Sequence, residues 1–121
     1  MNTNFNNVKQ GVVDTSYRAF SWGVSGTLTV ADEQGMKYIV PQDVTNIKIW
    51  AKTTSGSATV RVQKDTTDVI TGFAVTGVVG SSTTFASTTV SAGQVLTLDI
   101  TAISSGVDLY VVLDTQVQTI T

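Results

Sequence analysis

A strict alternation of large apolar residues with small or polar ones constrains the fold of this chain more than any other feature. In its first third, Phe20, Trp22, Val24, Leu28 and Val30 all occupy even positions, and the odd positions between them carry Ser, Gly and Thr. Successive side chains of a β-strand point to opposite faces, so a period of two indicates a half-buried strand. We therefore predict one long strand here, with its large side chains on the buried face.

The same alternation returns several times along the chain. Further strands are predicted at residues 36–40, 47–52, 58–63, 69–79, 83–90, 95–101 and 107–117. The segments 47–52 and 58–63 flank the turn Thr54-Ser55-Gly56-Ser57 and are expected to pair as a hairpin. The 21 Thr and 19 Val residues suit strands, and the single Glu leaves few good helix formers. The sequence thus predicts an all-β fold: an antiparallel β-sandwich, jelly-roll-like, of about eight strands.

The chain divides into two parts by composition. Residues 1–17 are Asn-rich at the start and show no alternation, whereas alternation is strict from residue 18 onward. We expect an extended N-terminal arm over 1–17 and a single β-sandwich domain over 18–121. A length of 121 residues is ordinary for one domain.

Composition excludes several classes of function. With no Cys and no His, the chain has no disulfide, none of the usual zinc ligands and no Ser–His or Cys–His pair for nucleophilic catalysis. Seven basic residues against nine acidic ones make no basic field for nucleic acid. No apolar run approaches 18 residues, and the N-terminus lacks the pattern of a secretory signal. We expect no enzyme activity, no cofactor, no nucleic-acid partner and no membrane partner.

Carboxylates leave one catalytic alternative open. Asp99, Asp108 and Asp114 lie on or beside the last two predicted strands, and a pair of carboxylates is what glycoside hydrolysis requires. The favoured interpretation is that Asp99 and Asp114 are outward strand positions and that Asp108 begins a strand.

Calcium is a second alternative. Asp65 and Asp68 share one turn, and Asp32 and Glu33 share another. Calcium takes six to eight oxygen ligands, which two carboxylates do not supply. Hydrogen bonds from these side chains to the turn backbone explain them more simply, so no metal site is predicted.

The segment 47–63 carries the most informative surface. If its apolar residues face the core, the opposite row holds Lys48, Trp50, Lys52 and Arg61. Trp and Arg are typical of the centres of protein contacts, and indole rings also serve as platforms for sugars. Two interpretations stay open: the row is an interface or ligand face, or Trp50 is covered by the arm or a loop of the same chain.

Three segments together resemble a known group of proteins. They are SWGVSGTLTVAD, YIVPQDVTNIKIWAKTTSGSATVRVQKDTTDVI and STTVSAGQVLTLDITAISSGVDLYVVL, within residues 20–113. In this order they are similar to small β-sandwich modules of tailed-bacteriophage virion proteins, which occur in head-decoration, head-fibre and tail proteins. Two turns depart from that pattern: Gln94 stands where Asp is usual, and Asp65-Thr66-Thr67 stands where Asn-Gly is usual.

The resemblance implies a structural protein of the virion, made in the host cytoplasm. The expected function is a capsid decoration or cement protein, or a head-fibre subunit, that binds the particle through its arm and one sheet face. The alternative is a small tail or baseplate subunit or a receptor-binding module for cell-surface glycans. The resemblance also implies a homo-oligomer, most simply a trimer, bound to a major capsid or tail protein. The residues expected at partner contacts are Phe5, Val8, Val12, Val13, Tyr17, Lys48, Trp50, Lys52 and Arg61.

Overall fold

The structure, a computed structural model, describes residues 13–120, and in this range it contains seven β-strands and no helix. The strands are β1 (Val13–Thr27), β2 (Tyr38–Ile39), β3 (Val44–Lys64), β4 (Thr67–Val75), β5 (Gly80–Ser82), β6 (Thr89–Val90) and β7 (Val95–Ile120). Every strand pair is antiparallel. The predicted all-β, antiparallel class is confirmed.

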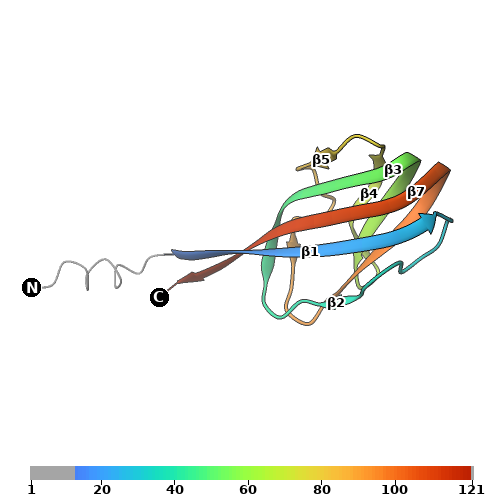
Figure 1. Cartoon of the computed structure of the whole chain (residues 1–121). Helices are drawn as coiled ribbons and strands as arrows, with labels where there is room; N and C mark the ends of the chain where they lie inside the picture. The colour runs from blue at the N-terminus through green and yellow to red at the C-terminus, as the bar shows by residue number, and fades with distance from the viewer. Residues whose placement is uncertain (1–12, 121) are drawn as a thin grey trace, which may run out of the picture.

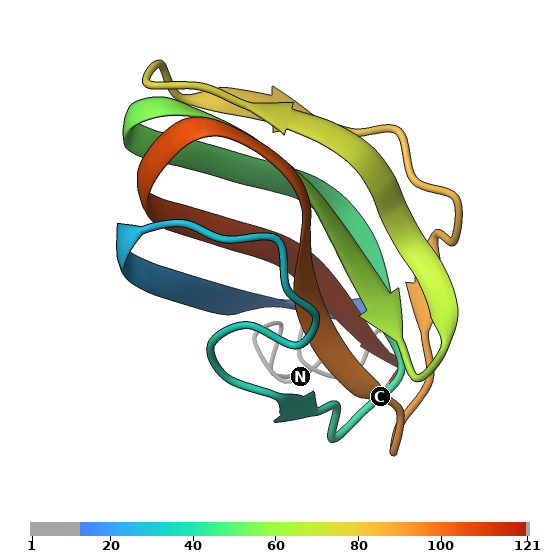
Figure 2. The same ribbon diagram turned by 90° about the vertical axis from the view of Figure 1, so that its right-hand side faces the viewer.

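The two longest strands, β3 and β7, form a ribbon that folds over on itself. They pair from Thr45 opposite Gln116 to Lys64 opposite Leu96, along almost all of β3. Midway, the ribbon bends sharply where Gly56 of β3 faces the 104–106 segment of β7, and Figure 2 shows both bends side by side. The fold-over brings the two ends of the ribbon to face each other across the protein interior.

Each half of the folded ribbon pairs with a different set of neighbouring strands. Beside residues 44–53 of β3, the order is β1, β7, β3, with the short β5 and β6 on the far edge of β3. Beside residues 58–64 of β3, the order is β2, β7, β3, β4. This arrangement is consistent with a β-sandwich, and the jelly-roll connectivity stays a prediction.

Apolar side chains from both halves fill the space between them. The largest buried side chains are Leu28, Ile49, Leu96, Leu98, Ile100, Leu109 and Leu113, together with Val40, Val60, Val62, Val69 and Val75. Most of them belong to the alternating rows that the sequence predicts to face inward. Burial of these rows is the main source of stability for a fold without disulfides.

The predicted hairpin between 47–52 and 58–63 is wrong. No residue of β3 pairs with another residue of β3, because each half already has β7 on one edge and β4, β5 or β6 on the other. Likewise, the predicted strands 95–101 and 107–117 are one strand, β7, that bends between them. The turns at Gly56 and Ser104–Gly106 are real, but they fold a ribbon and do not join partners.

The predicted first strand is longer at its start and shorter at its end. Its inward row is right for Phe20, Trp22 and Leu28, which are buried, and wrong for Val30, which is 61% exposed. The regular pairing of β1 with β7 shifts after Val24 and ends at Thr27. Beyond Thr27 the chain is no longer a strand, so alternation no longer predicts which side chains are buried.

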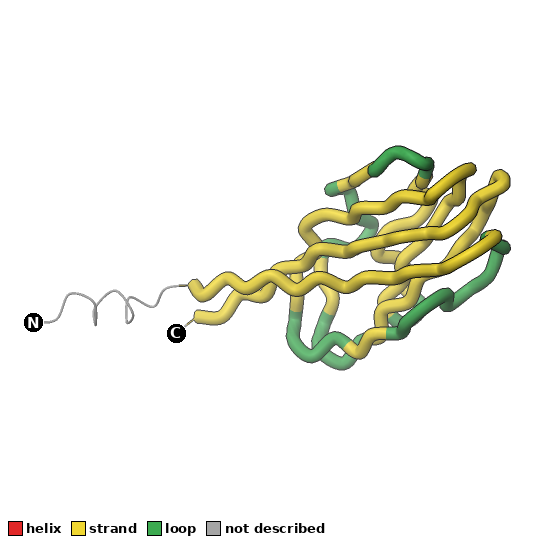
Figure 3. Tube along the Cα trace, viewed as in Figure 1, coloured by secondary structure: helices red, strands yellow, loops and turns green. Residues whose placement is uncertain are grey.

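The boundary predicted between residues 17 and 18 falls inside a strand. β1 runs without interruption from Val13, which pairs with Ile120. β3 leaves β7 at Gln116, so the first residues of β1 and the last residues of β7 continue as a two-stranded ribbon that projects from the body (Figure 1, Figure 3). The predicted contact residues Phe5, Val8 and Val12 lie outside the described residues.

Candidate functional site

Neighbouring strands place Trp50, its flanking lysines and a tyrosine on one outer sheet face. In the β3–β7 register, Lys48 is opposite Asp114, Trp50 is opposite Val112, and Lys52 is opposite Tyr110. The residues that alternate with them, such as Ala51 and Val111, are buried. The pleat therefore directs this set of side chains away from the core.

The indole of Trp50 is held in place on both strands. Its Nε1 donates a hydrogen bond of 3.0 Å to Oδ2 of Asp114 on β7. The Nζ of Lys48 lies 4.1 Å from the ring centroid, within the range of a cation–π contact. Trp50 is 37% exposed and Tyr110 is 55% exposed, so large aromatic surfaces remain open to solvent.

A shallow hollow of about 230 Å³ lies among these side chains. The 76–79 loop that leads into β5 borders it, with Val78 and Val79 exposed by 76% and 57%. We call the surface formed by the hollow and Lys48 the Trp50 face; its residues are Lys48, Trp50, Ala51, Lys52, Val79, Tyr110 and Val112. An open apolar centre with charged groups at its rim is the usual anatomy of a binding surface.

Three of the predicted contact residues meet on this face, and a fourth does not. Lys48, Trp50 and Lys52 lie together as expected, but Arg61 belongs to the other half of β3, beside Asp99. The prediction of one row fails because the ribbon folds at Gly56 between the two sites. Of the remaining predicted residues, Tyr17 is 71% exposed on β1, and Val13 is the first residue of that strand.

Sequence reasoning missed the β7 side of the face. Leu109, Val111 and Leu113 are buried, and Tyr110 and Val112 alternate with them and so lie on the outer face. Tyr110 and Val112 lie beside Trp50 because β7 pairs with the first half of β3. No local sequence pattern predicts this pairing.

Arg61 is part of an ion cluster that fastens a loop to the sheet. Its Nε and Nη2 each lie 2.8 Å from Oδ2 of Asp99, and Nη2 is 3.6 Å from Oδ1 of Asp32. The other oxygen of Asp99 accepts a 2.8 Å hydrogen bond from the Glu33 N–H. The hydrogen bond to Asp99 raises the pKa of Arg61 above its ordinary value, which keeps the guanidinium charged.

Asp99 alternates with the core residues Leu98 and Ile100, as an outward strand position should, yet it is only 1% exposed. The segment that follows β1 pairs with the edge of β7, with Ala31 bridging Ile100 and the N–H of Gln34 donating to the carbonyl of Leu98. It thereby covers a position that alternation alone assigns to solvent. A buried carboxylate that is fully paired in this way is a structural element.

The other carboxylates are also engaged within the fold. Asp108 accepts hydrogen bonds from the Gly26 N–H at 2.6 Å and from the Thr54 hydroxyl at 3.2 Å. Asp65 accepts one from the Val95 N–H, and Asp68 accepts one from Gln63. Within residues 13–120 there is no group of three or more His, Cys, Asp or Glu residues that could hold a metal ion.

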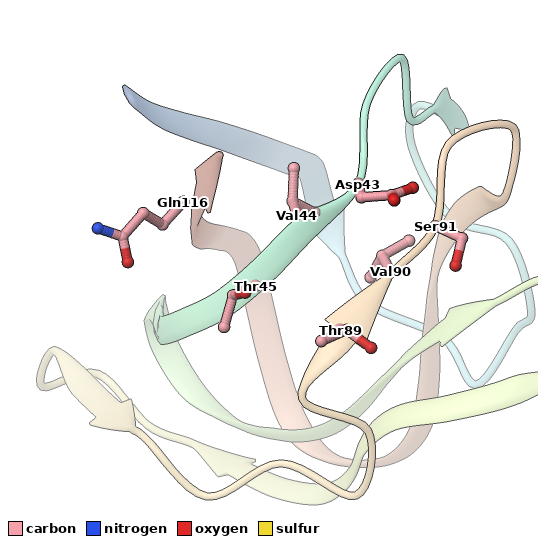
Figure 4. A pocket seen from close by; sticks show the side chains of 7 residues that line it. All are labelled: Asp43, Val44, Thr45, Thr89, Val90, Ser91 and Gln116. Carbon is pink, nitrogen blue, oxygen red and sulfur yellow. The ribbon is translucent and has the colours of Figure 1, made fainter. Parts of the chain in front are cut away.

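A second hollow, of about 330 Å³, lies where β6 meets the start of β3 (Figure 4). Its lining is formed by Asp43, Val44, Thr45, Thr89, Val90, Ser91 and Gln116. Asp43, its one charged residue, is already occupied, because Oδ1 accepts a 2.8 Å hydrogen bond from the Ala92 N–H. The lining offers hydroxyls but no aromatic ring and no cation, so the Trp50 face is the stronger candidate site.

Comparison with known proteins adds no relative: no protein-family model matches the chain, and no curated protein matches it. In the part of the chain that the structure describes, no helix is long and apolar enough to cross a membrane.

Proposed function

We propose that this chain is a non-enzymatic structural subunit of a tailed-bacteriophage virion, and specifically a capsid decoration, cement or head-fibre subunit on the particle surface. The virion setting comes from the resemblance of residues 20–113 to β-sandwich modules of such particles. The geometry contributes a two-stranded ribbon that projects from the body and, apart from it, an exposed sheet face around Trp50.

The projecting ribbon of β1 and β7 is the observation that carries the proposal. Beyond Gln116, β7 has no strand neighbour other than β1 among the described residues. An isolated two-stranded ribbon is marginally stable in water, and open strand edges invite pairing with another chain. The ribbon, with the 12 residues that precede Val13 in the sequence, therefore suits attachment to another virion protein (Figure 1).

Deletion of residues 1–16 tests this attachment. Deletion of residues 1–12 is the matched control, because it leaves strand β1 complete. The longer deletion removes the β1 side of the ribbon and should abolish binding to purified particles, while circular dichroism and solubility stay those of a folded β-domain. The shorter deletion keeps all the pairs from Val13 onward and separates the contribution of the arm from that of the ribbon. If the 1–16 deletion binds particles as the full chain does, the proposal is wrong.

The proposed oligomer is a homotrimer, on the resemblance alone. Light scattering of the full chain and of the 1–16 deletion measures it directly. A trimer that survives the deletion would place the subunit contact on the sandwich body, and loss of the trimer would place it on the arm or ribbon.

A second candidate function is favoured by the Trp50 face. Attachment through the ribbon leaves this lateral sheet face open, and its exposed aromatic rings suit a carbohydrate. A tail, baseplate or receptor-binding subunit would use such a face to contact cell-surface glycans. Binding of the isolated protein to a glycan array distinguishes this candidate from a subunit with purely structural contacts.

A further inference from the structure

We propose that the Trp50 face of this chain packs on the Trp50 face of a second copy, around a two-fold axis that runs parallel to β3 and β7. The inference goes beyond the proposed function, because neither the ribbon nor a glycan takes part in this contact. A two-fold contact joins copies in pairs, so it is also separate from the contact of the proposed trimer.

The charges on this side of the sheet are balanced and sorted by strand. The outward positions of β3 carry the cations Lys48 and Lys52, and those of β7 carry the anions Asp108 and Asp114. The hydrogen bonds that the two carboxylates accept leave their charges in place. One positive strand beside one negative strand selects neither an anionic nor a cationic partner. It does match a copy of itself in which the two strands are exchanged.

A two-fold axis between β3 and β7 makes this exchange. When two sheets stack with the axis along their strands, β3 of each copy lies over β7 of the other. Residues that are opposite in one sheet keep their level along the strands, so Lys48 of each copy meets Asp114 of the other. Stacked sheets keep their strand directions within about 30° of each other, so this order holds over a short contact.

The centre of the same contact is apolar and aromatic. Trp50 is opposite Val112 and Lys52 is opposite Tyr110 in the register, so the axis sets the Trp50 ring over the second copy's Val112. It also sets Lys52 against the second copy's Tyr110 ring, where a cation–π contact can form. The hollow of about 230 Å³ among these residues leaves room for the incoming side chains. Partly exposed Trp and Tyr side chains are typical anchors of such contacts.

The two margins of the sheet are complementary in shape. The 76–79 loop, which leads into β5 beside β3, carries the exposed Val78 and Val79. At the opposite margin, β1 presents the small residues Ser21 and Gly23, and the space around the Cβ position of Gly23 is open. Because the strand order here is β1, β7, β3, β5, the axis sets the loop of each copy over the β1 strip of the other.

The contact is expected to be weak between free copies. Its centre consists of few exposed apolar side chains, and each exposed ion pair contributes little. We expect a Kd on the order of 100 µM. Faces are then unpaired in dilute solution and paired where copies are concentrated.

Sedimentation velocity of the full chain, from about 5 µM to about 1 mM, tests the proposal. We expect the average mass to rise with concentration and Tyr110→Ala to weaken this association by about tenfold. Gly23→Arg should weaken it at least about threefold, because the long side chain meets the second copy's loop while nothing in its own chain obstructs it. Lys37→Gln, at an exposed lysine paired with Glu33, is the matched control and should associate as the parent does.

A pair of charge reversals tests the two-fold register. Lys48→Glu sets two carboxylates at each contact between copies, and Asp114→Lys sets two cations there, so each variant should associate at least about fivefold more weakly. An equimolar mixture of the two variants should associate about as well as the parent, because every contact between unlike variants again joins a cation and an anion. Mixing cannot restore an ion pair within one chain, so recovery reports a contact between copies.

Thermal melting of each variant shows whether it is folded, and Tyr110 and Gly23 are exposed positions that should tolerate substitution. The proposal is overturned if the mass of the folded parent does not rise with concentration, or if the mixture associates no better than its separate variants. A glycan that binds the parent in the absence of any rise in mass would assign the face to the second candidate function instead. Neither result alters attachment to particles, which the 1–16 deletion measures separately.

Discussion

Gly56 of β3 packs directly against the backbone carbonyl of Ser105 in β7, where the folded ribbon reverses direction. A Cβ on Gly56 would overlap that carbonyl, and the φ angle of 66° lies in the left-handed region that other residues seldom adopt. This single contact lets β3 and β7 turn together while they remain paired.

Replacement of Gly56 should therefore disrupt the fold. We expect Gly56→Ala to lower the free energy of unfolding by more than about 3 kcal/mol, because steric overlap with backbone adds to the cost of a left-handed alanine. Gly72→Ala is the matched control, since Gly72 has a φ of 68° but open space around its Cβ position. It should cost about 1 kcal/mol. Urea denaturation of both variants measures the difference, and equal costs would mean that the Gly56 contact is unimportant.

The ion cluster around Asp99 gives a second prediction. Arg61→Ala leaves a carboxylate that is 1% exposed without its cation and should lower the free energy of unfolding by about 3 kcal/mol. Lys37→Ala, which breaks the exposed Lys37–Glu33 pair, should change it by less than about 1 kcal/mol. Chemical denaturation at neutral pH compares the two; similar small losses would show that Asp99 does not depend on Arg61.

The same cluster predicts a pH dependence with a definite sign. Because the hydrogen bond to the Asp99 carboxylate raises the pKa of Arg61 in the folded state, the contribution of Arg61 is complete from neutral pH up to the ordinary pKa of arginine and is lost at more alkaline pH. The stability difference between the parent and Arg61→Ala should therefore stay constant from about pH 7 to about pH 10. A difference that falls within this range would contradict the assignment of the stabilising cation to Arg61.

Alternation predicts most of the strands and the core. It fails where contacts between distant segments determine which side chains are buried and which strands pair. The inward rows of β3 and β7, such as Val60 and Leu98, are buried as expected. Asp99 is buried against the same pattern, because the loop after β1 covers it. The turn at Gly56 was recognised, but a turn of this kind occurs equally in a hairpin and in a folded ribbon.

The candidate site was predictable only in part for the same reason. Lys48, Trp50 and Lys52 share one strand face, which a period of two reveals. Tyr110 joins them through a register that links residues nearly 60 positions apart in the sequence. Arg61 lies apart from them because the fold at Gly56 separates the two halves of β3, which a hairpin would have kept side by side.

We predict that the protein has no glycosidase activity, on the basis of the contacts made by its carboxylates. Asp99 is 1% exposed and paired with Arg61, and Asp108 and Asp114 accept hydrogen bonds from Gly26, Thr54 and Trp50, so each carboxylate has a structural partner in the fold. A panel of chromogenic glycosides, esters and phosphates should show no turnover above the blank. Turnover that disappears in Asp99→Asn or Asp108→Asn would contradict this prediction.

The two tryptophans provide a direct test of the facing of the sheet. Trp22 is 3% exposed, and its Nε1 donates a 2.8 Å hydrogen bond to the Met36 carbonyl, whereas Trp50 is 37% exposed beside Lys48. In Trp50→Phe the remaining emission should be blue-shifted and poorly quenched by iodide, because Trp22 lies in the core. In Trp22→Phe it should be red-shifted and more readily quenched, because Trp50 is partly exposed to solvent. Acrylamide, which is neutral, is the control for charge and should also quench Trp50 more than Trp22. If both variants respond alike to the two quenchers, Trp50 is covered in solution and the Trp50 face is not available to a ligand.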